Sequence, residues 1–223
     1  DVELSNNLNA AFKVPENLGA LPFEVTFEDY SSATDSTTIT SWAWDFDNDG
    51  NTDSQEPNPT FTFTTEGTYT VALTVSDGIN QYTRTLENYI YGLTNSSDIL
   101  VVNGIDYSNA TYIPEMQAFY NSSACFGNHN VDVWDLFGNQ GFNYGANSSF
   151  QNVHLFNRDI PNSVLDLYDK VIWIGNNFSG DLAFFNSAQV IQYVQNGGNF
   201  LLATRLGSNF FNTALKNYCG ILS

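Results

Sequence analysis

The segment that most constrains this chain is an acidic, glycine-containing stretch at residues 45–56. Its carboxylates stand at relative positions 1, 3, 5, 9 and 12, and Gly50 stands at position 6. This is the ligand spacing of a calcium loop, in which alternate side chains turn inward and a glycine permits a sharp bend. An acidic, solvated turn that binds no ion is the alternative. The predicted ligands for Ca²⁺ are Asp45, Asp47, Asp49, Asn51, Asp53 and Glu56.

The flanks of this stretch are not helical, which excludes an EF-hand. Residues 41–44 alternate polar and apolar side chains as a strand does, and Pro57 and Pro59 block a helix on the other side. Further short runs at residues 23–27 and 60–64 also alternate, and residues 68–75 are rich in Thr and Val. Several such runs with turns between them predict an antiparallel β-sandwich over residues 1–92.

The same residues resemble a known family. The chain resembles the PKD domain, an immunoglobulin-like module, in three places. These are Trp44-Asp45-Phe46 with the acidic loop that follows, Pro59, and the run Gly67-Thr68-Tyr69-Thr70-Val71-Ala72-Leu73-Thr74-Val75-Ser76-Asp77-Gly78. The resemblance covers residues 10–92 and implies an extracellular spacer, adhesion or accessory domain with no catalysis. Members with Asp-Phe-Asp in place of Asp-Phe-Gly are similar to this chain, and that version is the one expected to bind calcium.

Two tryptophans lie on one face of the strand before the loop, because side chains in a strand repeat every two residues. Trp44 is expected to fill the sandwich core. Trp42 is expected to be buried as well, and stacking of an exposed Trp42 on a sugar ring is the alternative.

The second half of the chain reads differently. Continuous apolar runs at residues 98–104, 168–175 and 199–204 are typical of buried parallel strands, and residues 131–136 alternate like an edge strand. Helical patterns stand between and after these strands, at 114–126, 187–196 and 207–218. Alternating strands and helices predict an α/β domain with a doubly wound parallel sheet over residues 98–223.

This half resembles the class I glutamine amidotransferase-like branch of the flavodoxin-like folds, on residues 99–102, 167–175 and 191–202. Members of that branch usually continue with further strands, so the domain looks truncated or minimal. Active members carry a Cys on a Gly-x-Cys-x-Gly turn, whereas residues 203–207 here read Ala-Thr-Arg-Leu-Gly. The missing nucleophile predicts a non-catalytic domain. His129 and His154 are expected to be loop or surface residues, with a role as a catalytic base as the alternative. Asp106 follows the first strand, at the end of the sheet where α/β domains bind ligands, but a single carboxylate does not by itself predict a site.

The charge, the cysteines and the sequons of the chain limit which partners and which cellular environment suit it. The chain has six Lys and Arg residues and 24 Asp and Glu residues, so its net charge is −18. This charge excludes charge-driven binding to nucleic acid or to an anionic membrane. No apolar run is long enough to span a bilayer, and the chain begins at Asp1, as a processed mature protein or a fragment does. Cys125 and Cys219 are predicted to form a disulfide, with two separate thiols as the alternative. Candidate glycosylation sequons start at Asn95, Asn109, Asn121, Asn147 and Asn177. The content of Asn, Ser and Thr in the chain is enough to explain this number of sequons by chance.

Together these patterns predict a secreted or cell-surface, calcium-binding adhesion or structural protein that is not itself an enzyme. A filament or surface-layer subunit is one form of this, with other extracellular proteins or further copies of the chain as partners. Two alternatives stay open: an accessory fragment of a secreted peptidase or glycan hydrolase, and a carbohydrate-binding module with glycans as partners.

Overall fold

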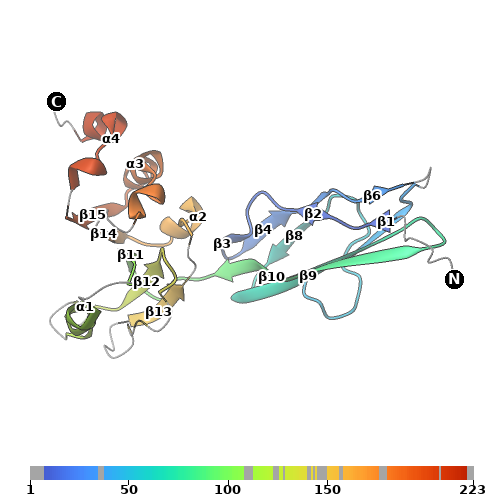
Figure 1. The fold of residues 1–223 in the computed structure, drawn as a ribbon, viewed down its shortest axis with the longest axis horizontal. Helices are drawn as coiled ribbons and strands as arrows, with labels where there is room; N and C mark the ends of the chain where they lie inside the picture. The colour runs from blue at the N-terminus through green and yellow to red at the C-terminus, as the bar shows by residue number, and fades with distance from the viewer. Residues whose placement is uncertain are drawn as a thin grey trace. The chain divides into compact units, whose positions relative to one another are not determined.

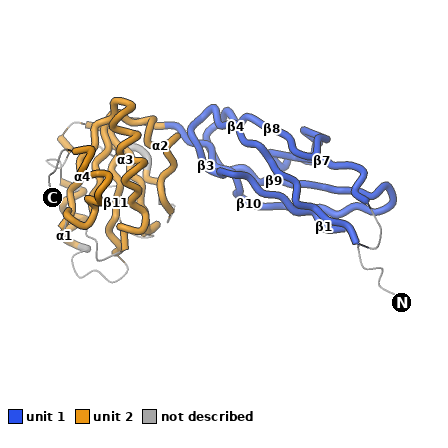
Figure 2. The backbone as a smooth tube through the Cα atoms, turned by 90° about the horizontal axis from the view of Figure 1, so that it is seen from above, with its two compact units in different colours: residues 1–94 blue, residues 95–223 orange. Residues whose placement is uncertain are grey.

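The computed structural model describes residues 8–34, 38–107, 113–122, 126–127, 129–139, 142, 144, 150–155, 158–175, 180–205 and 207–219. The chain separates into two compact units, Asp1–Thr94 and Asn95–Ser223, which Figure 2 colours differently. Each unit has its own sheets and its own core, and each is described by itself.

Unit 1 is built from strands alone among its described residues (Figure 1). Its main sheet has the order β3-β10-β9-β7, and three two-stranded ladders, β4-β8, β2-β5 and β1-β6, supply the remaining strands. The predicted β-rich, immunoglobulin-like architecture is confirmed for this unit. The strands are β1 (Leu8–Asn9), β2 (Phe12–Lys13), β3 (Leu18–Ala20), β4 (Phe23–Thr26), β5 (Glu28–Asp29), β6 (Ser32–Ala33), β7 (Ser41–Asp45), β8 (Thr60–Phe63), β9 (Gly67–Ser76) and β10 (Gln81–Leu93).

The core of unit 1 takes side chains from the main sheet and from the two-stranded ladders. Trp44 on β7 and Leu73 on β9 meet Val25 on β4 and Phe63 on β8, and all of them are buried. The alternation read from the sequence explains this, because in β4 every second residue is buried and the residues between are exposed. Trp44 therefore lies in the core, as the sequence predicted.

Unit 2 contains one five-stranded parallel sheet with the order β13-β12-β11-β14-β15. The predicted parallel sheet is confirmed, while its double winding stays a prediction. The strands are β11 (Ile99–Gly104), β12 (Val131–Asp135), β13 (Phe150–Leu155), β14 (Lys170–Gly175) and β15 (Asn199–Thr204). The helical segments are α1 (Ile113–Asn121), α2 (Asn162–Leu165), η1 (Asp181–Ala183), α3 (Ser187–Gln195), η2 (Gly207–Asn209) and α4 (Thr213–Tyr218).

The α3 helix shows how local sequence sets an element's ends. The Asn186 side chain accepts hydrogen bonds from the backbone N–H groups of Ala188 and Gln189, so Asn186 is the N-cap of the helix. At the other end Gly197 has a φ of 104°, which a glycine adopts without strain.

Two strand positions differ from the prediction. β12 was expected at an edge because Asp132 and Asp135 interrupt its apolar residues, yet it lies inside the sheet with all five residues buried. Both carboxylates receive hydrogen bonds, from groups that include Tyr168 and Tyr144, which is what permits their burial. β15 was expected in the centre, yet it is the last strand of the described sheet.

The predicted disulfide between Cys125 and Cys219 is not supported. Cys219 is a free, exposed cysteine just after α4, and Cys125 lies outside the described residues. Two cysteines in one sequence are compatible with a bridge, but only the placement of both side chains decides whether they meet.

We therefore expect the native protein to react with a thiol reagent at Cys219 without prior reduction. An exposed thiol is accessible to solvent and needs no unfolding to react. Peptide mapping after labelling checks this, with a Cys219→Ser variant as the control. Labelling of Cys219 only after reduction would restore the disulfide.

Of the candidate sequons, Asn109, Asn147 and Asn177 lie outside the described residues, and Asn121 ends α1. Asn95 is exposed, but its side-chain nitrogen donates hydrogen bonds to the carbonyl oxygens of Ser97 and Leu167, at 3.0 and 2.9 Å. Glycosylation of Asn95 would compete with these contacts. Within the described ranges no helix is both long and apolar enough to cross a membrane.

Candidate metal centre

The acidic loop is closed at its base by the backbone. The Trp44 N–H donates to the Ser54 carbonyl at 2.8 Å, and the Asp53 N–H donates to the Trp44 carbonyl at 2.7 Å. Between these points the chain turns through Asn48, with a φ of 58°, and Gly50, with a φ of 89°. The glycine therefore stands where the backbone needs a left-handed conformation, which was the reason to expect it there.

Three of the predicted ligands lie together. Asp45, Asp47 and Asp49 each offer a carboxylate oxygen, and these oxygens lie within 4.8 Å of one another. Oxygen ligands of Ca²⁺ stand about 2.3–2.6 Å from the ion, so two ligands of one ion are at most roughly 5 Å apart. The spacing of the three carboxylates therefore fits one shared cation.

Hydrogen bonds within the loop hold the carboxylates in place. The Asp45 carboxylate accepts from the backbone N–H groups of Asp49, at 3.2 Å, and Gly50, at 2.9 Å. One oxygen of Asp47 also accepts from the Asp49 N–H at 3.2 Å. These contacts bend the loop inward and bring its acidic side chains to one side of the turn.

The other three predicted ligands have different surroundings. The Asp53 carboxylate accepts a hydrogen bond from the Phe46 N–H at 2.7 Å, and Asn51 donates to Asp49 through both its backbone and its side chain. Glu56 is exposed, and its backbone carbonyl accepts from the indole N–H of Trp44 at 2.9 Å. Asp53 and Glu56 are not in the carboxylate cluster of the described residues.

The pKa values of two loop carboxylates move in opposite directions. The pKa of Asp47 is raised mainly by desolvation of its carboxylate and, as the second cause, by the negative charge of Asp49. Hydrogen bonds from the side chain and backbone of Asn51 lower the pKa of Asp49. The repulsion felt at Asp47 is what a bound cation would relieve.

The glycan alternative depended on an exposed Trp42. The structure instead places Trp42 half-buried against the core of unit 1, where its indole N–H donates to the Asp29 carboxylate at 2.8 Å. No local pattern indicates this pair, because thirteen positions separate the two residues and only the packing of the strands brings them together.

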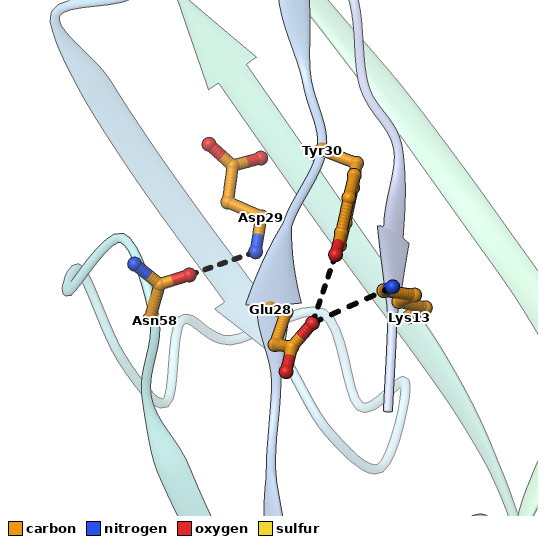
Figure 3. Close-up of polar contacts among 5 residues, drawn as sticks. All are labelled: Lys13, Glu28, Asp29, Tyr30 and Asn58. Atoms are coloured by element: carbon orange, nitrogen blue, oxygen red, sulfur yellow. Dashed lines mark hydrogen bonds and ion pairs between the residues drawn. The ribbon is translucent and has the colours of Figure 1, made fainter. Parts of the chain in front are cut away.

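A polar cluster surrounds Asp29 on the same unit (Figure 3). The Asp29 N–H donates to Asn58, and the Glu28 carboxylate accepts from the Tyr30 hydroxyl at 3.0 Å and pairs with Lys13 at 3.7 Å. The Lys13 ammonium lies 4.2 Å from the centre of the Tyr30 ring, and the Tyr30 hydroxyl is the main cause that raises the pKa of Lys13. Tyr30 is 53% exposed, but its ring already has a cation beside it.

The two histidines of unit 2 have different surroundings. His129 is exposed, and the ring of His154 packs 5.9 Å from that of Trp134. Thr204 ends β15. Cys219 stands a helix later, after α4.

Comparison with known proteins identifies unit 1. The family model described as PKD domain matches residues 7–90, so the resemblance read from the sequence is confirmed for this part of the chain. A match to this family points to a non-catalytic module for residues 7–90. A search of curated proteins gives no match to the chain.

Solved structures similar to the chain include two further PKD domains. The PKD1 domain of the Vibrio cholerae metalloprotease PrtV is 32% identical, with 35% of this chain and 91% of that chain covered and a TM-score of 0.28. The PKD1 domain of Vibrio anguillarum Epp is 32% identical, with 37% and 94% covered and a TM-score of 0.29. A structure of carbohydrate-binding modules from the β-sandwich superfamily is 26% identical, with 40% and 37% covered and a TM-score of 0.33.

Proposed function

We propose that this protein is an extracellular structural or adhesion module whose PKD domain is stabilised by Ca²⁺. The observation that carries the proposal is the cluster of Asp45, Asp47 and Asp49 carboxylates in a loop closed at Trp44 and Ser54. Hard oxygen ligands at this spacing suit Ca²⁺. The ion would neutralise the repulsion between the carboxylates and hold the loop rigid.

Partners of such a module are other extracellular proteins or further copies of the same chain, as in a filament or surface layer. The net charge of −18 argues against nucleic acid as a partner. We also propose that unit 2 is doubly wound and non-catalytic. Two observations support double winding. The strand order runs outward from β11 in both directions along the sheet. Tyr120 of α1 packs in one cluster with Val101 and Val133, so this helix covers one face of the sheet.

The calcium site is tested by replacing Asp47 and Asp49 together with Asn. In millimolar Ca²⁺ the double variant should melt at a lower temperature than the parent, whereas in chelator the two should melt alike. A ligand present at one hundred times its Kd stabilises by about 2.7 kcal/mol, so the Ca²⁺-dependent part of the shift is large enough to measure by calorimetry.

A matched control replaces Glu24 and Glu87, two exposed acids of unit 1 outside the loop, with Gln. This control removes the same charge and should keep the full response to Ca²⁺. If the Asp variant loses equal stability with Ca²⁺ and with chelator, the loop is an acidic turn that binds no ion.

A further inference from the structure

The chain enters unit 2 through a segment that is hydrogen-bonded before the first strand begins. Unit 1 ends at Thr94, so tension applied through unit 1 reaches unit 2 at Asn95, whereas β11 starts only at Ile99. Segments that join two domains are commonly exposed and flexible, with few contacts to either domain. Residues 95–98, which we call the strap, are instead bonded to the rest of unit 2 at every position.

Two of these contacts reach the β14 side of β11. The Asn95 side chain donates to the Leu167 carbonyl at 2.9 Å, three positions before β14 begins. The Asp98 carbonyl accepts from the backbone N–H of Lys170, the first residue of β14, at 3.0 Å. The parallel ladder then continues from Ile99, which stands opposite Lys170. The strap therefore extends the contact between β11 and β14 toward the start of unit 2.

The other contacts reach the β12 side of β11. The Asp132 carboxylate accepts hydrogen bonds from the backbone N–H of Ser96, at 2.8 Å, and from the Ser96 hydroxyl. The Ser97 hydroxyl donates to the carbonyl of Asn130, the residue before β12. Asp132 is fully buried, and hydrogen bonds to a charged group are roughly twice as strong as those between neutral groups. These contacts therefore fix the strap to an interior strand of the sheet.

We propose that the strap distributes tension that enters unit 2 over the neighbouring strands β12, β11 and β14, so that β11 is not pulled from the sheet one hydrogen bond at a time. Bonds that are loaded in succession break singly, whereas bonds that are loaded together must break together. β11 lies between β12 and β14, and the strap is bonded on both of these sides. The inference rests on the proposed structural or adhesion role, because such a module transmits force between its partners.

The test is single-molecule pulling of the full chain between two handle proteins fused to its ends. Unit 2 is Asn95–Ser223 and unit 1 is Asp1–Thr94, so their unfolding releases about 450 and about 330 Å of chain, and length distinguishes the two events. The double variant Asn95→Ala, Ser96→Ala removes three side-chain hydrogen bonds of the strap. At constant force it should shorten the lifetime of unit 2 at least about tenfold, because forced unfolding follows the unfolding rate.

Tyr168→Phe is the matched control. It removes a hydrogen bond to the same Asp132 carboxylate, but from a donor outside the strap. It should lower the stability of unit 2 in denaturant by a similar amount, yet shorten the lifetime under force less than about threefold. Asn95 and Ser96 are exposed, so the double variant should stay folded. All chains are produced without glycosylation, because Asn95 begins a candidate sequon.

An unchanged lifetime of unit 2 in the double variant would overturn the proposal. Equal shortening in the double variant and in Tyr168→Phe would also overturn it, because the strap would then contribute only to overall stability. Chelator separates this result from the calcium site, since removal of Ca²⁺ concerns the unit 1 event. If the unit 1 event does not respond to chelator, the calcium proposal fails, while the unit 2 event still decides the role of the strap.

Discussion

Replacing Trp44 with Ala should unfold unit 1 at a much lower temperature than in the parent. Trp44 is fully buried, and its ring centre lies 5.2 Å from that of Phe12 and 5.4 Å from that of Phe27. Truncation of a buried Trp to Ala costs about 3–5 kcal/mol, and each kcal/mol lowers the melting temperature of a domain this size by about 4–8 °C. The variant also loses the hydrogen bond from the indole to the Glu56 carbonyl.

Hydrogen exchange separates the effect on the two units. In the Trp44→Ala variant the amides of residues 8–94 should lose protection, while those of residues 95–219 should keep it. Trp42→Ala is the control, because Trp42 is only half-buried and its truncation should cost less. A loss for Trp44→Ala no greater than for Trp42→Ala would mean that the core is not organised around Trp44.

The second large effect is expected at Asp132, in the middle of the unit 2 sheet. Its side chain is fully buried and accepts hydrogen bonds from the Ser96 backbone N–H at 2.8 Å, from the Ser96 hydroxyl and from the Tyr168 hydroxyl at 3.0 Å. Hydrogen bonds to a charged group contribute about 1.5–3 kcal/mol each, and buried donors left unpaired add a desolvation cost. Asp132→Ala should therefore destabilise unit 2 by at least about 3 kcal/mol.

Denaturant unfolding measures how much each contact contributes to the free energy of unfolding, with the variants Asp132→Ala, Asp132→Asn and Tyr168→Phe. Asn keeps the volume and one accepting oxygen, so its loss should be intermediate, and Tyr168→Phe removes a single donor. If Asp132→Ala is as stable as the parent, the buried carboxyl group contributes nothing to the fold of unit 2.

Local patterns in the sequence were enough to predict much of unit 1. Gly50 marks a turn that needs a positive φ, and the alternation in residues 23–26 gives the buried face of β4. These predictions succeed because the period of a strand and the conformational freedom of glycine act over a few neighbouring residues. The spacing of the acidic residues likewise predicted the approach of Asp45, Asp47 and Asp49, since all three belong to one short loop.

The errors fall where distant residues decide the outcome. Asp132 looked like an edge residue because a carboxylate is costly to bury, but Ser96 and Tyr168, 36 positions away on either side, supply its donors. Trp42 is half-buried, and the sequence did not indicate that Asp29 accepts the hydrogen bond from its indole. Cys125 and Cys219 suggested a bridge, and Cys219 proved to be free.

The sequence by itself determined that the chain has a β-rich PKD-like half and a half with parallel strands, and it located the acidic loop and the strand before it within the first half. The tertiary structure alone decided which strands stand inside the second sheet and which stand at its edge. The reason is that an apolar run such as residues 199–204 favours a buried strand but does not specify the neighbouring strand that would bury it, and every second residue of β15 is exposed. Strand order depends on contacts between residues far apart in the chain, and no local period encodes them.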